Sequence, residues 1–160
     1  QKREDNMAIH KIDGVDGVDG GGGIFSFPKK FVTLHCAGVV VKGQWVQIET
    51  DTGVAGFQKN GLGATVNKAD AVAAGNMAIL GVATETLTAA GLLRVQTAGK
   101  FENASVANAV AAGDALVVDD TAAGQAVEIT ASDVGNACGL CLEAPSGNQA
   151  DVLIVDQGYF

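Results

Sequence analysis

Cysteines are the residues of this chain whose type and spacing most directly suggest chemistry. Cys138 and Cys141 form a CxxC pair, a spacing used by thiol–disulfide enzymes and by half of a structural zinc site. A redox CxxC lies at a helix N-terminus, but the residues around this one are typical of a strand, where positions i and i+3 face opposite sides. A zinc site needs about four ligands, and only Cys36, His35 and His10 remain to complete it. The pattern favours buried apolar cysteines over the redox and metal alternatives.

Two further pairs could serve catalysis. His35 precedes Cys36, but neighbouring residues of a strand point to opposite faces and cannot act as base and nucleophile for each other. Glu85 and Glu143 could form a carboxylate pair for acid–base work, yet they end similar strands of an internal repeat, which favours structural roles. The sequence contains no GxSxG motif. We therefore predict a protein that is not an enzyme and takes no cofactor.

The N-terminal segment ends in the run DGVDGVDGGGG. Asp13, Asp16 and Asp19 could hold calcium, but they lack the alternating ligands and distal Glu of an EF-hand. A solvated linker is favoured, because glycines lose the most backbone entropy when they become ordered. We predict a flexible or extended arm over residues 1–23 and no metal site. The pair Met7-Ala8 resembles a translation start, so residues 1–6 are left out of the fold prediction.

Composition and charge restrict the class of protein. The 160 residues suit one domain, and 22 glycines with 5% aromatic residues predict an aliphatic core with many tight turns. The N-terminus has no apolar leader and no apolar run could span a bilayer, so we expect a soluble, unsecreted protein without a membrane partner. The net charge is −8, and nine acids but no Lys or Arg occur from Phe101 onward. Phosphate binding needs clustered cations, so we expect no nucleic-acid partner.

The pattern of the body predicts short strands. Residues of Gln44–Glu49 alternate between apolar and polar, and Val39–Val41, Ala115–Val118 and Val152–Val155 are short apolar runs rich in β-branched residues. Turn signals recur about every 8–12 residues, a spacing typical of β-sandwiches and β-barrels. The Ala-rich stretches 68–74 and 103–112 could each form one or two helical turns.

An internal repeat divides the body into two similar halves, at about residues 36–96 and 107–156. Ala37–Gln44 is followed by one strand, and Ala107–Asp114 by another, at an offset of 70 residues. Each half continues with a Gly-led strand that ends in Glu, a turn and a further strand. A unit of this size cannot cover its own apolar face, so we expect the halves to share one core. The prediction is an all-β, duplicated barrel or sandwich spanning residues 24–160 as a single domain; whether it forms one barrel or two lobes is left open.

The same residues resemble the small decoration, or cement, proteins of tailed-phage heads. Ala112–Val118 is similar to the Ala-Gly-Asp-led strand of that family, Cys138–Ala144 to its Gly-led strand ending in Glu-Ala, and Ala150–Val155 to its closing Val-rich strand. The similarity covers roughly residues 36–156. It implies a jelly-roll- or β-tulip-like protein that stabilises an assembled capsid, often as a homotrimer, where capsid subunits meet. The glycine-rich arm is a departure from the family pattern and leaves the mode of attachment open.

These implications define the predicted contacts and location. Phe25, Phe27 and Phe31 lie just beyond the arm and either plug the protein's own barrel or anchor it on a neighbouring subunit. Lys29 and Lys30 would pair with an acidic surface of the major capsid protein. We expect a virion protein on the outer capsid surface, assembled in the host bacterial cytoplasm. The alternative is another phage assembly component, such as a tail, spike or fibre adaptor on a β-barrel.

Overall fold

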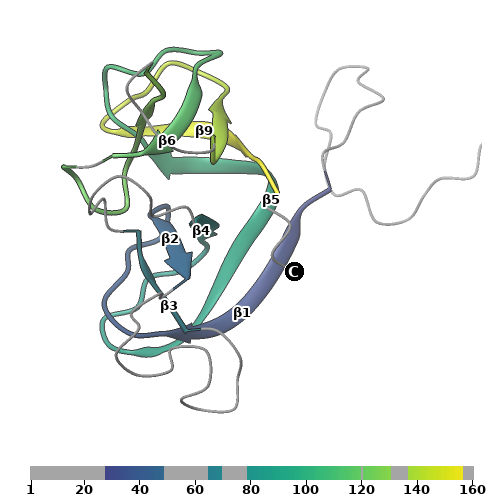
Figure 1. Ribbon diagram of the computed structural model, residues 1–160, viewed down its shortest axis with the longest axis vertical. Helices are drawn as coiled ribbons and strands as arrows, with labels where there is room; N and C mark the ends of the chain where they lie inside the picture. The colour runs from purple at the N-terminus through teal and green to yellow at the C-terminus, as the bar shows by residue number, and fades with distance from the viewer. Residues whose placement is uncertain (1–27, 49–64, 70–78, 120, 131–136, 157–160) are drawn as a thin grey trace, which may run out of the picture.

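The computed structural model of the chain describes residues 28–48, 65–69, 79–119, 121–130 and 137–156 (Figure 1), and within these ranges it is all-β without a helix. The strands are β1 (Lys30–Cys36), β2 (Trp45–Ile48), β3 (Thr65–Lys68), β4 (Ile79–Ala83), β5 (Gly91–Ser105), β6 (Ala115–Val118), β7 (Ala126–Glu128), β8 (Gly139–Cys141) and β9 (Gln149–Ile154). The predicted all-β, duplicated barrel is confirmed. The predicted arm, residues 1–23, lies outside the described residues and stays a prediction.

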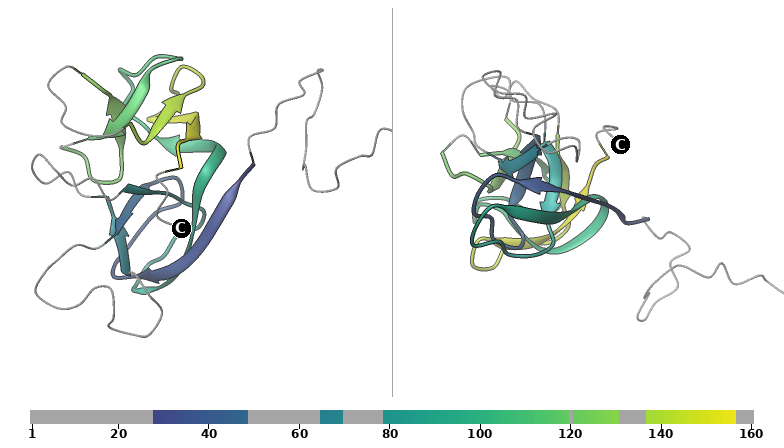
Figure 2. Two further views of the ribbon diagram at one scale, coloured as in Figure 1. Left: turned by 45° about the vertical axis from the view of Figure 1, so that its right-hand side comes forward. Right: turned by 90° about the horizontal axis from the view of Figure 1, so that it is seen from below.

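The strands form two lobes that are stacked end to end (Figures 1 and 2). In the first lobe, the order β1-β3-β2-β4-β5 is closed by antiparallel pairing of β1 with β5, which makes a five-stranded barrel. In the second lobe, the order is β5-β9-β8-β6-β7, and a parallel bridge between Val106 and Ala126 links its two ends. We call the described residues within 28–98 the first lobe and the described residues within 99–156 the second lobe.

Strand β5 belongs to both lobes. Its first part pairs with β1 and β4 of the first lobe, and its second part, from Gly99, pairs with β9 of the second lobe. The strand turns at Gly99, whose φ of +88° is readily accessible only to glycine. The buried Gln96 amide spans this turn, because its Nε2 donates hydrogen bonds to the carbonyl oxygens of Ala98 (3.0 Å) and Lys100 (2.9 Å). One side chain thus holds the bend that separates the lobes.

The two lobes repeat one another residue by residue. Trp45 pairs with Val82 in the first lobe as Ala115 pairs with Leu140 in the second. The backbone N–H of Gly43 donates to Ala83 (2.9 Å), and that of Gly113 donates to Cys141 (2.8 Å), with both glycines at positive φ. Equivalent residues are 70 positions apart in the sequence as far as β2 and β6. They are 57 or 58 positions apart when β4 and β5 are compared with β8 and β9, because the intervening loops differ in length. The internal repeat is therefore real structural duplication.

Each lobe has its own core, which corrects the expected single shared core. Nine of the ten buried residues of the first-lobe cluster have an equivalent in the second-lobe cluster. The pairs, in chain order, are Leu34 and Ala104, Cys36 and Val106, Val40 and Val110, Val46 and Leu116, Val66 and Ala126, Leu80 and Cys138, Ala83 and Cys141, Leu93 and Ala150, and Val95 and Val152. A barrel encloses its own inward-facing side chains, so two closed units make two interiors. The second cluster also takes in first-lobe residues that face across the junction: Trp45, Ala69, Ile79 and Val82.

Trp45 is the principal side chain at this junction. It is fully buried in the second-lobe cluster although its strand belongs to the first barrel. Its Nε1 donates a hydrogen bond to the Ser105 carbonyl oxygen (3.1 Å). A Cβ at Gly139 would lie 2.9 Å from the indole ring, so this strand position has room only for glycine. The indole thereby joins the two cores through packing and one satisfied polar group.

Most predicted strands are observed, and the predicted helical turns are partly wrong. Ala115–Val118 is strand β6 as predicted, whereas only Val40 of the run Val39–Val41 makes a β-bridge, to Leu87. Residues 103–105 belong to β5 and residues 106–112 form a bridge and turns. Asn103 has a φ of +59°, which a right-handed helix does not allow, and Val106 and Val110 are buried in the core. This Ala-rich segment therefore forms part of the barrel. Of the other segment, residues 70–74 lie outside the described residues.

We expect Trp45→Ala to lower the free energy of unfolding by about 3–5 kcal/mol, because it removes a buried ring and leaves a cavity between the lobes. Urea unfolding followed by circular dichroism measures this loss without the tryptophan signal. The exposed Val39 provides a control, since Val39→Ala should change stability by less than about 0.5 kcal/mol. A loss below about 1 kcal/mol for Trp45→Ala would show that the indole does not join the lobes.

Candidate contact surface

The cysteines are buried and unbridged, as the sequence predicts. Cys36 lies in the first-lobe core, and Cys138 and Cys141 lie in the second-lobe core. The Cys138 and Cys141 thiols donate to the carbonyl oxygens of Leu116 (3.3 Å) and Glu143 (3.0 Å), respectively. Burial raises the pKa of Cys138 to about 12 and also raises the pKa of Cys141. Because the thiolate is the nucleophile and metal ligand, both sulfurs are poorly suited to redox or metal chemistry at neutral pH.

The other chemical candidates do not converge. Cys36 points into the first-lobe core, while His35 is half-buried and lies outside that cluster. Glu85 Oε1 accepts the backbone N–H of Arg94 (2.9 Å), and Glu143 Oε1 accepts that of Asp151 (3.1 Å). The two carboxylates therefore occupy equivalent structural positions in separate lobes, as expected. Within the described ranges, no group of three or more His, Cys, Asp or Glu side chains could hold a metal ion.

Only part of the predicted contact set lies in the described residues. Phe25 and Phe27 fall outside them. Lys29 and Lys30 are exposed at the start of β1, and Lys30 Nζ pairs with Asp156 Oδ2 of the same chain. Phe31 is 42% exposed and does not fill the barrel interior. The partners predicted for these residues stay predictions.

Phe31 belongs to an exposed apolar and cationic surface. Alternation along β1 and β5 places Phe31, Thr33 and His35 beside Leu92 and Arg94 on the outside of the first barrel, and we call these five residues the β1–β5 face. The Arg94 guanidinium lies over the Phe31 ring, 4.1 Å from its centroid, in a cation–π contact. Leu92 is 56% exposed, so a large aliphatic side chain faces solvent at the other end.

Sequence reasoning missed Leu92 and Arg94. They lie some sixty residues from Phe31 in the chain, and only the pairing of β1 with β5 brings them together. A weak signal was present in the doublet Leu92-Leu93. Because neighbouring strand residues face opposite sides, one of two consecutive leucines must point away from the barrel interior.

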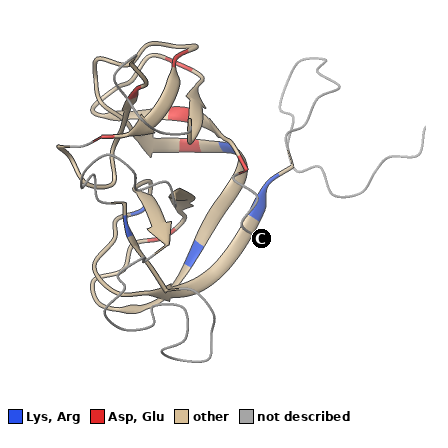
Figure 3. Ribbon diagram, in the orientation of Figure 1, with Lys and Arg blue, Asp and Glu red and all other residues tan. Residues whose placement is uncertain are grey.

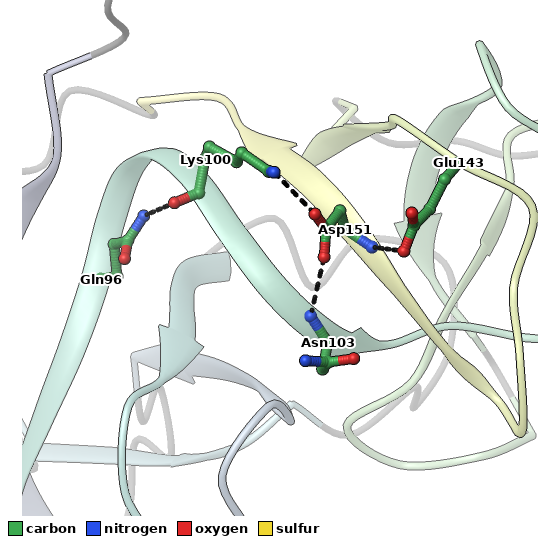
Figure 4. Close-up of polar contacts among 5 residues, drawn as sticks. All are labelled: Gln96, Lys100, Asn103, Glu143 and Asp151. Carbon is green, nitrogen blue, oxygen red and sulfur yellow. Dashed lines mark hydrogen bonds and ion pairs between the residues drawn. The ribbon is translucent and has the colours of Figure 1, made fainter. Parts of the chain in front are cut away.

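The equivalent surface of the second lobe is polar and internally paired (Figure 4). Lys100 Nζ lies 2.7 Å from Asp151 Oδ2, and the backbone N–H of Asn103 donates to Asp151 Oδ1 (3.3 Å). The hydrogen bond to Asp151 is the main cause of a raised Lys100 pKa. Lys100 occupies the place of Phe31, and Asp151 that of Arg94, judged by strand register. An ion pair thus replaces the cation–π contact.

Charge is divided between the lobes (Figure 3). Among the described residues, the first lobe contains five Lys and Arg against one Glu, whereas the second lobe contains one Lys against seven acids. In the described residues, the blue positions lie mainly on the first lobe and the red ones on the second. The molecule is therefore strongly polarised along its length. Within the described ranges, no helix is long and apolar enough to cross a membrane.

No protein-family model matches the sequence, and no curated protein matches it. Among solved structures, the chain is similar to the crystal structure of the N base of the head fibre gp8.5 of bacteriophage phi29. The identity is 16%, the TM-score is 0.49, and the match covers 80% of this chain and 95% of that chain.

We expect stability to fall with rising pH above about 9, because folding raises the Cys138 pKa from its ordinary 9.0 to about 12. The folded thiol keeps a proton that the unfolded chain releases, so its contribution is complete below pH 9 and is lost as the pH rises toward 12. Relative to Cys138→Ala, the wild-type free energy of unfolding should fall by about 1.4 kcal/mol per pH unit in this window.

Urea unfolding of both proteins with a reductant, at about pH 8 and about pH 10.5, measures this difference. The alanine variant is the matched control, because it retains every other group that titrates in this range. Equal losses of stability in the two proteins would show that the Cys138 thiol is accessible to solvent in the folded state.

Proposed function

We propose that the protein is a structural component of a phage particle, which decorates an assembled capsid and stabilises it by contacts between its oligomer and the capsid. The observation that carries this proposal is the contrast between interior and surface. The thiols of the described residues are buried, and Glu85 and Glu143 bind backbone N–H groups, whereas Phe31, Leu92 and Arg94 stand on an outer face. Such a surface is suited to binding another protein and not to catalysis.

The resemblance to head decoration proteins supports the same assignment. Its three elements, Ala112–Val118, Cys138–Ala144 and Ala150–Val155, contain β6, β8 and all but the first residue of β9 in the second lobe. These strands are neighbours in the sheet order β9-β8-β6. The residues that carry the resemblance therefore make one structural unit, which the first lobe repeats.

A decoration protein acts through mass action. It contacts surfaces that exist only when capsid subunits are assembled, so its binding free energy shifts the equilibrium away from disassembly. In this proposal, Lys29 and Phe31 at the start of β1 contact an acidic and apolar part of the major capsid protein. Phe25, Phe27 and the arm extend that contact, at an entropic cost that is offset by the additional surface covered. Lys30 would join after exchanging its partner Asp156.

The remaining parts of the proposal concern assembly and location. The protein associates with itself, as a homotrimer, on the outer capsid surface after assembly in the host cytoplasm. It has no catalytic role, because the thiols and carboxylates described above are engaged in structure. The surplus of acids in the second lobe disfavours a nucleic-acid partner and keeps closely spaced copies soluble.

Deleting residues 7–23 should weaken attachment to heads at least about tenfold without unfolding the barrels, since the arm adds contact area only. Cosedimentation of the truncated and full-length proteins with purified heads measures occupancy, and circular dichroism checks the fold. Phe31→Ala should lower occupancy in the same assay, while Val39→Ala, also exposed, serves as its control. Unchanged occupancy of the truncated protein would remove the arm from the mechanism.

The number of copies in a particle separates decoration from the alternative. A decoration protein occurs in hundreds of copies, whereas a tail, spike or fibre adaptor occurs in few. Quantitative mass spectrometry of intact particles, normalised to the major capsid protein, gives this number. A low copy number would favour the adaptor, and absence from particles would overturn both.

A further inference from the structure

Because the two lobes share one fold, the surface residues of one lobe can be compared with those at equivalent positions of the other. Equivalent positions in the two lobes meet the same backbone demands, so a difference in surface chemistry between them does not come from the fold. Leu92 corresponds to Gln149, because each pairs with an equivalent residue, His35 and Ser105 respectively. Phe31 and Arg94 correspond to Lys100 and Asp151, which pair with each other. The exposed apolar character of the β1–β5 face is thus specific to the first lobe.

A second apolar surface lies on the acidic lobe. Alternation along β8 and β9 places four aliphatic residues on the outside of the second lobe: Leu140, Leu142, Leu153 and Val155. Leu140 and Leu153 are paired and half-buried, while Leu142 and Val155 are 40% and 44% exposed. We call these four residues the β8–β9 face. Lys100 pairs with Asp151 beside this face, so Glu143 is the acid at its edge, and the opposite charge lies in the surplus of acids on the second lobe as a whole.

The fold already covers a surface of this kind once. Leu140 is equivalent to Val82, which is fully buried with Trp45 where the second lobe packs on the first. Within a single chain, the first lobe therefore uses this side of β4 to bind another lobe. The same side of β8 in the second lobe is left half-buried in the described structure. Since a lobe covers the equivalent side of β4, a lobe from another copy of the chain is a suitable partner for this side of β8.

We propose that copies of this protein associate head to tail, with the β1–β5 face of one copy docked on the β8–β9 face of the next. Each face offers exposed aliphatic or aromatic side chains, and the cationic lobe meets the acidic one. Opposite charges favour this pairing over contact between two like faces. Because the two faces differ, each copy retains one unused face after docking, so the contact repeats from copy to copy and closes into a ring where the rotation between copies allows it, as the homotrimer of the proposed function requires. This inference rests on the self-association in the proposed function and defines its geometry.

Two surface variants test the pairing. The first, Phe31→Asp with Leu92→Asp, adds acids to the face that meets the acidic lobe. The second, Leu142→Asp with Val155→Asp, places acids in an apolar contact, and it leaves both altered faces acidic, so that they repel each other when the variants are mixed. Native mass spectrometry and sedimentation velocity of the full chain report oligomeric state. We expect each variant alone to be monomeric, with the dissociation constant raised about 100-fold or more, as expected when central interface residues are replaced.

Mixing the two variants is the decisive step. Each variant retains the face that the other has lost, so an equimolar mixture contains one intact pairing and should form a heterodimer that grows no further. This result also shows that both variants are folded. Val39→Asp with Val41→Asp is the matched control, because these valines are exposed outside both faces and the oligomer should persist.

Three outcomes would overturn the head-to-tail pairing. The wild-type protein could be monomeric at concentrations well above those in which particles assemble. One variant could stay oligomeric while the other dissociates, which would mean that a face pairs with itself. The mixture could fail to form a heterodimer although circular dichroism shows both variants folded. If the wild-type protein forms the oligomer but does not bind purified heads in the separate cosedimentation assay, only the proposed function is contradicted. The oligomer experiment contains no capsid, so its result does not depend on head binding.

Discussion

A single strand, β5, is hydrogen-bonded into both barrels. Strand β5 closes the first barrel through β1 and β4, then begins the second barrel beside β9. Both roles are compatible only if the strand changes direction between them, and the turn at Gly99, held by the Gln96 amide, provides that change. Everything else in the architecture depends on this bend, because it sets where the second lobe lies on the first.

The junction that results is packed rather than hinged. The Trp45 indole crosses from one barrel into the core of the other, and its hydrogen bond to Ser105 satisfies the one polar atom that it buries. Gly139 leaves the space that the ring occupies. A shared strand and a shared aromatic side chain together hold the two lobes in one arrangement. Surfaces on different lobes can therefore act as fixed parts of a single binding unit.

Chemistry and contact are separated in this molecule. In the described part of the chain, the three thiols are buried, and Glu85 and Glu143 accept backbone N–H groups. The outer faces carry Phe31, Leu92 and Arg94 on the cationic lobe and Leu142 and Val155 on the acidic one. The duplicated plan makes this division visible, because the ion pair of Lys100 with Asp151 stands where the first lobe has an exposed aromatic ring and a guanidinium.

The sequence by itself determined the class of fold, the duplication and the burial of the cysteines. These follow from local pattern: alternation and β-branched runs predict strands, and the offset of 70 residues aligns Ala37 with Ala107. Only the tertiary structure decided that there are two cores, that Trp45 joins them, and that Leu92 and Arg94 lie beside Phe31. Closure of a barrel and pairing of strands sixty residues apart are non-local, so no window of sequence contains them. The helical turn expected near Asn103 failed for the same reason, because pairing with β9 outweighed the weak helical preference of an Ala-rich segment.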